Sequence, residues 1–232
     1  KKTSINFAKL LDIVAKSFPK FRIRFTTSNP QDMDNEVLIT MKAHKNICNH
    51  IHLPVQSGSD KILKEMNRQH TRKEYLNLVT EIKTILPNCG ISQDMITGFP
   101  NETEEDHLDT LKLMDYVKYD FGFMFKYSER PGTLAAKKFN DNVPEDVKQR
   151  RLSEIIDLQL KHSYHNLLNY RGKTVSVLIE KESKKSSKHW CGRNPQNLMV
   201  VFPKNKLKLG EFVNVKITDN TSTTLIGHFV NE

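Results

Sequence analysis

The sequence predicts an α/β protein in which part of a parallel (β/α) barrel precedes a small, all-β, OB-like barrel. Two observations carry this prediction. Over the first 143 residues, a strand pattern that ends in polar or Gly/Pro residues is repeatedly followed by a helix pattern, which is typical of parallel sheets. After one long helix pattern, the hydrophobic period changes from helical to two. We therefore expect a barrel part at residues 1–143, a connecting helix at 144–170 and a second domain at 171–232.

The chain opens on a helix pattern with no methionine in front of it. Apolar residues recur there at helical spacing: Ile5, Phe7, Leu10, Leu11 and Val14. Because the chain begins inside a regular element, we expect it to be a fragment of a longer protein.

The strand-then-helix unit occurs four times in the first part. The four segments are "FRIRFTTSNP", "HIHLPVQSGSD", "ISQDMITGFPNET" and "FGFMFKYSERPGT". Thr103, with Asp106 three residues on, predicts a capping box, which places "GFPN" in the loop between a strand and its helix. Ligands of such barrels bind at the carboxyl ends of the strands, so we expect the function in these loops.

The second part begins with one helix pattern from Pro144 to about Tyr170, with Gly172 just after it. Five short segments of period two follow: "KTVSVLIEK", "HWCGR", "NLMVVFP", "EFVNVKITD" and "TTLIGHFV". Their number and length suit a small OB-like barrel.

Charge and cysteine content narrow the class of protein. Thirty-six Lys and Arg against 27 Asp and Glu give a net charge of +9, which favours a polyanionic partner such as nucleic acid or an acidic membrane surface. Cys48, Cys89 and Cys191 lie far apart, and the nine histidines show no paired ligand spacing. We expect no disulfide framework, no metal site in this chain and a reducing, intracellular location. No apolar run approaches the roughly 20 residues that span a bilayer, so we expect a cytoplasmic protein.

Two strand ends in the first part carry candidate ligand groups. In "HLPVQSGSD", Ser59 or Asp60 can cap the next helix, which leaves Gln56 and Ser57 without a structural explanation. In "SQDMITGFP", alternation places four residues on one face, and glycine allows a flat ligand to approach the backbone: Ser92, Asp94, Ile96 and Gly98. An ordinary tight turn is the alternative for the glycine.

Two arginines in the first part are ambiguous. Arg68 follows a helix, so it can stabilise the helix C-terminus or turn back toward the strand ends. Arg130 in "YSERPGT" is a donor suited to carboxylate or phosphate, and a surface arginine before a turn is equally consistent.

The second domain places cations around its one tryptophan, Trp190. These residues are Lys181, Lys184, Lys185, Lys188 and Arg193. Cations beside an aromatic ring favour single-stranded nucleic acid, and a solvated loop around a core tryptophan is the alternative.

Taken together, these stretches resemble the radical-SAM methylthiotransferases, and most closely their tRNA branch. The resemblance runs nearly end to end, through "RIRFTTSNP", "HLPVQSGSDKILKEMNR", "DMITGFPNETEED" and "YSERPGTLAA", and the domain with "GRNPQN" resembles a TRAM domain. The sibling branch, which modifies a ribosomal protein, carries different residues in "HLPVQSGSD" and "YSERPGT". Asn29 and Asn101 depart from the usual His and Gly of the family.

The resemblance implies the C-terminal part of a radical-SAM, TIM-like barrel followed by a TRAM domain. It implies methylthiolation of C2 of N6-isopentenyladenosine next to the anticodon, with S-adenosylmethionine and two 4Fe–4S clusters as cofactors and a tRNA anticodon stem-loop as partner. The family holds its clusters on a Cys-x-x-x-Cys-x-x-Cys loop and on three cysteines of an N-terminal domain, and this chain has neither set. We therefore expect this chain to be inert by itself. We also expect it to be monomeric.

The resemblance also assigns residues. S-adenosylmethionine needs neutral hydrogen-bonding groups, for which Gln56 and Ser57 are our candidates, and one cation for its carboxylate, for which Arg68 is our candidate. The strand end with Asp94, Ile96, Gly98 and Phe99 matches the stretch that contacts adenine in the family. For substrate and RNA the expected residues are Tyr127, Ser128, Arg130, Lys184, Lys185, Lys188, Trp190 and Arg193. No catalytic residue is assigned.

Three other functions remain open at this point. One is a non-catalytic RNA-binding module, and another is a methylthiotransferase of the ribosomal-protein branch. The third is a barrel lyase or aldolase that uses Lys126 and Asp94. It is disfavoured because no second cation lies near Lys126 in the sequence to depress its pKa.

Overall fold

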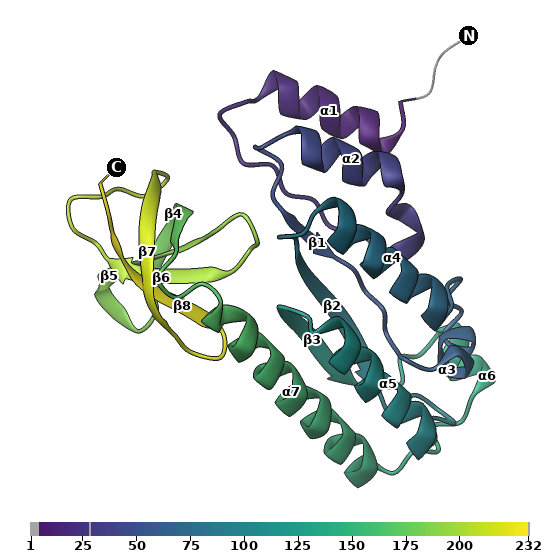
Figure 1. Ribbon diagram of the computed structural model, residues 1–232. Helices are drawn as coiled ribbons and strands as arrows, with labels where there is room; N and C mark the ends of the chain where they lie inside the picture. The colour runs from purple at the N-terminus through teal and green to yellow at the C-terminus, as the bar shows by residue number, and fades with distance from the viewer. Residues whose placement is uncertain (1–4, 28, 232) are drawn as a thin grey trace.

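The computed structural model describes residues 5–27 and 29–231, in two parts that one long helix joins (Figure 1). The first part is built on a parallel sheet of order β1-β2-β3, with β1 at His50–His52, β2 at Gly90–Thr97 and β3 at Phe121–Lys126. The second part is a closed barrel of order β4-β5-β6-β8-β7. This arrangement confirms the predicted fold class.

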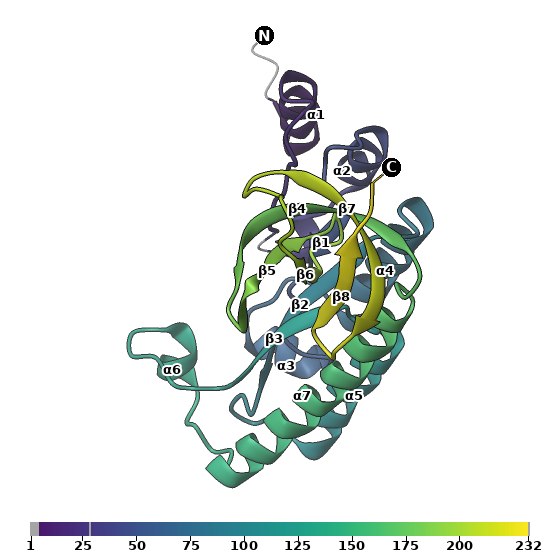
Figure 2. The same ribbon diagram turned by 90° about the vertical axis from the view of Figure 1, so that its left-hand side faces the viewer.

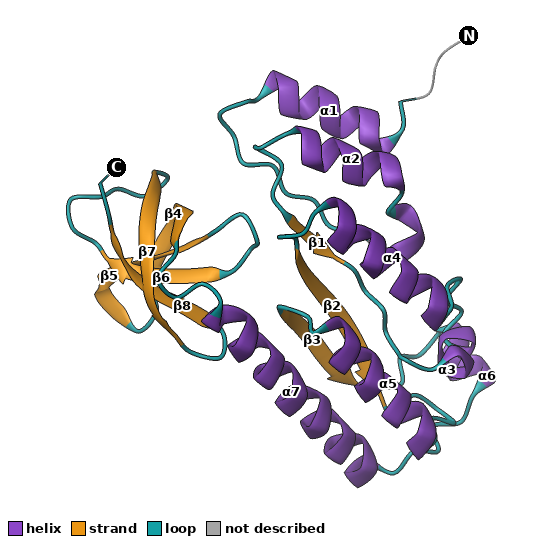
Figure 3. Cartoon of the chain, viewed as in Figure 1, coloured by secondary structure: helices purple, strands orange, loops and turns teal. Residues whose placement is uncertain are grey.

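The helices gather on one side of the parallel sheet, except for α6, which stands away from it (Figures 2 and 3). They are α1 (Phe7–Ser17), α2 (Asn35–Ala43), α3 (Asp60–Glu65), α4 (Arg72–Ile85), α5 (Glu104–Val117), α6 (Leu134–Lys138) and α7 (Glu145–Leu168), with a 3-10 turn at Pro30–Asp32. Outward-facing strand residues such as Ile51 and Met95 pack into the core against Tyr75 and Leu113, all fully buried. On the other face, the rings of Phe123 and Phe125 are 54% and 55% exposed, as on the inner face of a barrel of which only part is present.

The predicted helix starts are confirmed. The Ser59 side chain accepts a hydrogen bond from the Ile62 amide, which caps α3. Thr103 and Asp106 form the capping box of α5 in both directions. Both caps end a loop that follows a strand, so they fix the two loops that bear the candidate ligand groups.

The expected strand over residues 21–30 is wrong. The structure gives this segment a single parallel bridge, Ile23 to Ile47, and no regular strand. The Arg22 and Arg24 guanidinium groups instead donate to the carbonyl oxygens of Arg193 and Asn194, at 2.5 and 2.7 Å. These side-chain bonds attach the segment to the second part of the chain. Ser28 lies outside the described residues.

The second part confirms the five predicted strands. They are β4 (Thr174–Ser183), β5 (Ser186–Arg193), β6 (Met199–Pro203), β7 (Phe212–Asn220) and β8 (Thr224–Phe229), and Figure 2 shows them curling around one another. Alternate residues fill the interior: Val177, Ile179, Val200, Phe202, Val215, Ile217 and Leu225. Leu167, near the end of α7, packs into the same core, so the helix and this barrel are joined by buried apolar contact.

Among the described residues, none of the helices has the length and apolar content to cross a bilayer.

Candidate functional site

A cavity of about 1070 Å³ opens where the three parallel strands end. Its lining comes from the segments that follow β1, β2 and β3, and from α6, which Figure 2 shows standing away from the sheet. Four of the residues predicted for the cofactor line it, namely Gln56, Arg68, Ile96 and Phe99, together with Tyr127 from the predicted substrate set. The position matches the ligand site of α/β barrels.

Gln56 has an unusual backbone conformation, although its peptide groups still pair with β2. Its φ is +72°, in the left-handed region that non-glycine residues rarely adopt. The peptide still pairs with β2, because the Gln56 amide donates to Asp94 O at 2.9 Å and its carbonyl accepts from the Ile96 amide at 2.9 Å. Gln56 lines the cavity, and its side-chain amide makes no hydrogen bond to another described residue, so we expect it to be available to a ligand.

Arg68 places an unpaired, half-buried cation at the same cavity. Its backbone amide donates to Leu63 O at 2.8 Å, at the end of α3. Its guanidinium makes no hydrogen bond or ion pair with any described residue. Burial lowers its pKa, and the charge of Asp94 acts in the opposite direction. A buried cation without a partner is unfavourable in a folded chain, so this position favours an anionic ligand group.

Ser57 and Asp94 lie outside the cavity. Ser57 is fully buried, and its hydroxyl accepts from the Ser59 amide at 3.2 Å and lies 3.4 Å from Thr110 Oγ1. Asp94 lies on the open face of the sheet, with Oδ2 3.4 Å from His52 Nε2. The geometry therefore gives Ser57 a role in shaping the loop, and its contact with the cofactor stays a prediction that the structure does not favour.

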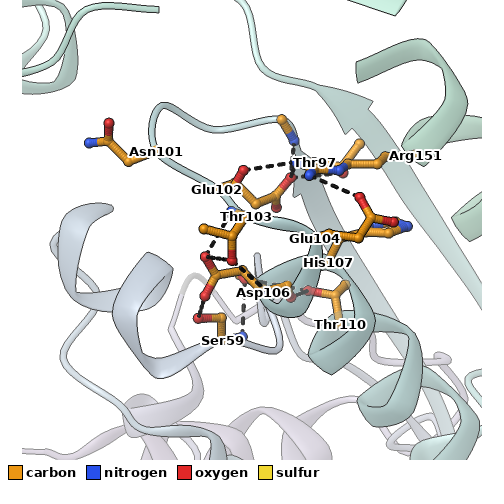
Figure 4. Close-up of polar contacts among 12 residues, drawn as sticks. Ser59, Thr97, Asn101, Glu102, Thr103, Glu104, Asp106, His107, Thr110 and Arg151 are labelled. Atoms are coloured by element: carbon orange, nitrogen blue, oxygen red, sulfur yellow. Dashed lines mark hydrogen bonds and ion pairs between the residues drawn. The ribbon is translucent and has the colours of Figure 1, made fainter. Parts of the chain in front are cut away.

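The two ligand-bearing loops are tied to each other through Asp106. Its carboxylate accepts from the Ser59 hydroxyl at 2.6 Å and from Lys61 Nζ at 3.0 Å, as well as from Thr103 (Figure 4). Burial opposes ionisation, but these bonds together lower the pKa of Asp106 to about 2. The carboxylate therefore stays charged and holds the two loops together at neutral pH.

The turn after β2 contains a buried ion pair that sequence reasoning missed. Glu102 accepts from the Gly98 amide at 2.6 Å and from Arg151 Nη1 at 2.9 Å, and both side chains are at most 5% exposed (Figure 4). Burial raises the pKa of Glu102, while the Gly98 amide and Arg151 act to lower it. Glu102 and Arg151 are 49 positions apart, and no local pattern relates them.

Phe99 and Tyr127 form an apolar wall of the cavity. The Phe99 ring meets Tyr127 edge-on at 5.1 Å and Phe139 at 5.8 Å. Ser128 and Arg130, which follow Tyr127, are exposed and do not line the cavity. Lys126 pairs with Glu145 at the surface and also lies outside the cavity, so it is not the buried amine that an aldolase would use.

The small barrel carries a second candidate site, a groove of about 670 Å³ over the outer face of β5, β6 and β8. Its floor is made by Cys191, Met199, Val201 and Ile226, and burial raises the pKa of the Cys191 thiol, which keeps it neutral. Its rim contains three lysines (Lys181, Lys184, Lys185), with His189 and the hydroxyl groups of the β7–β8 turn. This is the face with which OB-folds bind oligonucleotides.

The other predicted RNA-binding residues lie away from this groove. Trp190 Nε1 donates to Leu207 O at 3.1 Å, Lys204 Nζ lies 4.5 Å from the ring centroid, and the ring packs against the barrel core. Arg193 donates to Asn197 O at 2.9 Å and lines a cavity between the two parts. Lys188 is exposed outside the groove. The structure favours a core position for Trp190, and its stacking on a base stays a prediction.

Sequence profiles of two known families match the chain: the radical SAM superfamily over residues 3–114 and the TRAM domain over residues 168–230. A protein of Christiangramia forsetii is 64% identical over 227 residues, which are 98% of this chain and 47% of that protein. One of Flavobacterium psychrophilum is 60% identical over 230 residues, which are 99% of this chain and 48% of that protein. Both are named tRNA-2-methylthio-N(6)-dimethylallyladenosine synthase.

Among solved structures, coproporphyrinogen III oxidase of Escherichia coli, described as a radical SAM enzyme, superposes with a TM-score of 0.56 at 15% identity. The match covers 81% of this chain and 50% of that one, and at this identity it supports the fold alone. The chain spans about half the length of the curated relatives it matches. The chain therefore has a region that matches the radical SAM superfamily followed by a TRAM domain, and over almost all of its length it is similar to about half of each of these synthases.

Proposed function

We propose that this chain supplies S-adenosylmethionine-binding and RNA-binding parts of an enzyme that methylthiolates C2 of N6-isopentenyladenosine beside the anticodon of tRNA. The observation that carries the proposal is the cavity at the strand ends, where a free guanidinium and a free amide stand beside an apolar wall. The names of the relatives support the reaction and the substrate. A tRNA substrate implies a cytoplasmic location, and the expected monomeric state stays a prediction.

The cavity suits the chemistry of S-adenosylmethionine. The cofactor offers a carboxylate, for which Arg68 is the available cation, and hydroxyl and ring groups that the Gln56 amide can bond. Its adenine is flat and largely apolar, and the wall of Ile96, Phe99 and Tyr127 offers a surface for it. These residues bind and orient the cofactor and keep water from it, while the hard chemistry belongs to the cofactor itself.

The iron–sulfur clusters must be held by residues outside this chain. In the described part, no three His, Cys, Asp or Glu side chains gather as ligands for a metal ion. In the whole enzyme, a cluster held by other residues would supply the electron for radical chemistry, while residues such as Arg68 and Gln56 would hold and orient S-adenosylmethionine. This chain alone is therefore expected to bind and not to react.

RNA recognition is proposed for the groove on the small barrel. Three lysines at its rim can meet phosphates, and the apolar floor can lie under a base or ribose. Tyr127, in the wall of the cofactor cavity, is a candidate for contact with the target nucleoside. Ser128 and Arg130 lie beyond it on the surface, where they remain proposed substrate contacts.

A chimera tests the proposal. The N-terminal half of the Christiangramia forsetii relative, joined to this chain, reconstituted with iron and sulfide and supplied with S-adenosylmethionine and a one-electron reductant, should methylthiolate an anticodon stem-loop that contains N6-isopentenyladenosine. Mass spectrometry detects the product. Arg68→Ala in the chimera should reduce the product. A chimera that carries both clusters, binds the stem-loop and yields no product would instead favour a non-catalytic RNA-binding module.

A further inference from the structure

The first turns of α7 reach the loop that forms the apolar wall of the cofactor cavity. Arg151 Nη1 donates to Glu102 Oε2 at 2.9 Å and to the Glu102 carbonyl oxygen at 3.0 Å, and its Nη2 lies 3.2 Å from Glu104 Oε2. One side chain thus binds the backbone and the carboxylate of the same residue. Such a two-point attachment fixes the orientation of Glu102 as well as its charge.

Glu102 in turn fixes the turn at Gly98. The same Oε2 atom that accepts from Arg151 also accepts from the Gly98 amide at 2.6 Å and from the Thr97 hydroxyl at 3.3 Å. Gly98 has φ +71°, and the next residue is Phe99, whose ring lines the cavity. The chain of contacts therefore runs from α7 through one carboxylate oxygen to the backbone that bears the cavity wall.

A second residue of α7, on the same face of the helix as Arg151, packs against the same turn. A Cβ on Gly98 would lie 2.4 Å from Lys148 Cγ, so the backbone of the turn rests directly on the Lys148 stem. The Lys148 ammonium pairs with Asp141 and lies 5.6 Å from the centroid of the Tyr127 ring. Lys148 is only 4% exposed, which is rare for lysine. Two buried cationic side chains of one helix thus hold the turn, Lys148 by packing and Arg151 through Glu102.

We infer that Arg151 is a positioning residue for the S-adenosylmethionine cavity, which it shapes through Glu102 and the Gly98–Phe99 turn without touching the ligand. The inference rests on the proposed cofactor site. Removing Arg151 leaves a buried carboxylate without its counter-ion, and such a group either takes up a proton or moves toward water. Either change weakens the bond to the Gly98 amide and frees the turn, so Phe99 loses its fixed position.

Three variants separate positioning from general stability. Arg151→Met removes the cation and retains much of the volume. The double variant Arg151→Met/Glu102→Gln also removes the unpaired carboxylate, while the new amide oxygen can still accept from Gly98. Arg150→Met is the matched control, since Arg150 is the neighbouring residue and pairs with Glu104 and Glu154 on the exposed side of α7.

Hydrogen exchange of the free chain and titration calorimetry with S-adenosylmethionine give the readouts, at a temperature where melting curves show every variant folded. Arg151→Met should speed exchange in the 98–103 segment selectively, and raise the dissociation constant about tenfold, equivalent to about 1.4 kcal/mol. The double variant should recover most of both effects, and Arg150→Met should change neither. These results would support the inference.

Unchanged exchange at 98–103 in Arg151→Met, or an unchanged dissociation constant, would overturn it. So would a uniform rise in exchange over the whole chain, since that outcome shows a merely structural role. If the unmodified chain binds no S-adenosylmethionine at millimolar concentration, the proposed cofactor site fails and the positioning role fails with it. The exchange data then still show whether Arg151 orders the turn, so the two failures are distinguishable.

Discussion

At the residue scale, Arg68 is a half-buried cation at the cavity with no ion-pair partner among the described residues, which favours an anionic ligand group. We predict that Arg68→Ala weakens S-adenosylmethionine binding by about 1.5–3 kcal/mol, the range for a charge-assisted hydrogen bond. Titration calorimetry on the chain measures this directly. Binding by the unmodified chain should itself be weak, because the cluster iron that would chelate the cofactor's amino-carboxylate is not held here. Sub-micromolar affinity would contradict that expectation.

Two further variants sharpen the Arg68 experiment. Arg68→Lys keeps the charge and loses the planar fork, so it should recover only part of the affinity. Arg130→Ala removes an exposed arginine outside the cavity and should leave cofactor binding intact. An unchanged dissociation constant in Arg68→Ala would remove this residue from the site.

Gln56 offers a way to separate ligand binding from backbone strain. Gln56→Gly relieves the left-handed backbone and removes the whole side chain with its amide. These effects on the folded state oppose each other, so the free energy of unfolding should change by no more than about 1 kcal/mol. Cofactor affinity should fall about two- to tenfold, as for one lost neutral hydrogen bond. Lys118→Gly is the control, because Lys118 is also left-handed, at φ +55°, and ends α5 away from the cavity. Chemical denaturation and calorimetry on both variants decide the matter.

At the scale of elements, local patterns were sufficient for the parts of the fold that local interactions determine. The Thr103 capping box, the helix over 145–168 and the five strands of the small barrel all follow from spacing within a few residues. The segment at 21–30 has equally strong β character, but only Ile23 finds a bridge partner. Strand formation depends on a neighbour distant in sequence, which composition does not reveal.

The residues of the candidate site were likewise predictable only where local patterns determine their position. Gln56, Ile96 and Phe99 follow strands, and the rule that barrel ligands bind at strand ends brings them together. Ser57 directly follows Gln56 but points into the packing against α5, because it alternates with Gln56 and is buried like Leu53 and Val55. The pairing of Glu102 with Arg151 joins two elements, and only their packing shows it.

Asp120, at the start of β3, predicts a pH dependence of stability. Burial raises its pKa from 3.8 to about 6, against the lowering effect of the Ile91 amide and Asn166. An acid with a raised pKa keeps its proton longer in the folded state, so its stabilising contribution is complete below pH 3.8 and is lost as pH rises through about 6. The loss amounts to about 1–3 kcal/mol.

Asp120→Asn removes this titration and leaves the other groups unchanged. The difference in unfolding free energy between variant and parent should therefore shift in favour of the variant between about pH 4 and 6, and be constant above it. Urea unfolding at several pH values measures that difference. A flat difference would show that Asp120 titrates normally. The absolute stability of the variant does not enter, because only its change with pH is compared.

Trp190 tests whether its ring belongs to the core of the small barrel or contacts RNA. The Trp190 ring packs on the core and its indole nitrogen donates to the Leu207 carbonyl, so Trp190→Ala should lower the free energy of unfolding. The upper limit is about 3–5 kcal/mol, the loss typical of a buried aromatic. RNA affinity should change little, measured where the variant is folded. A loss of about 1–3 kcal/mol in binding without a fall in melting temperature would instead indicate that the ring stacks on a base.

At the scale of the whole molecule, α7 connects the two candidate sites. One end of the helix carries Lys148 and Arg151 under the cofactor loop, and the other places Leu167 in the core of the small barrel (Figure 1). Just beyond it, Arg171 donates to Asn220 at 2.7 Å, next to the β7–β8 turn that lines the RNA groove. The arrangement presents both sites on one continuous scaffold, which suits the proposed binding of a cofactor and a large RNA.

A chain with a net charge of +9 is expected to bind RNA nonspecifically, so RNA binding alone is weak evidence for the groove. The salt dependence of binding must therefore be compared between variants that lack lysines at different positions. We predict that the unmodified chain binds an anticodon stem-loop with an affinity that falls steeply with salt. Changing the three rim lysines Lys181, Lys184 and Lys185 to alanine should weaken binding and reduce the slope of log affinity against log salt by about 2, from roughly 0.7 for each contact to single-stranded backbone.

The matched control removes the same charge elsewhere on the small barrel. Lys206, Lys208 and Lys216 are exposed outside the groove, and their triple alanine variant should keep the slope nearly unchanged. Lys188→Ala alone decides whether the exposed strand beside the groove also meets a phosphate, by a change of about 0.7 in slope. Fluorescence anisotropy at several salt concentrations gives all four slopes. Equal losses in the two triple variants would mean that the RNA responds to overall charge, and would remove the groove from the proposed interface.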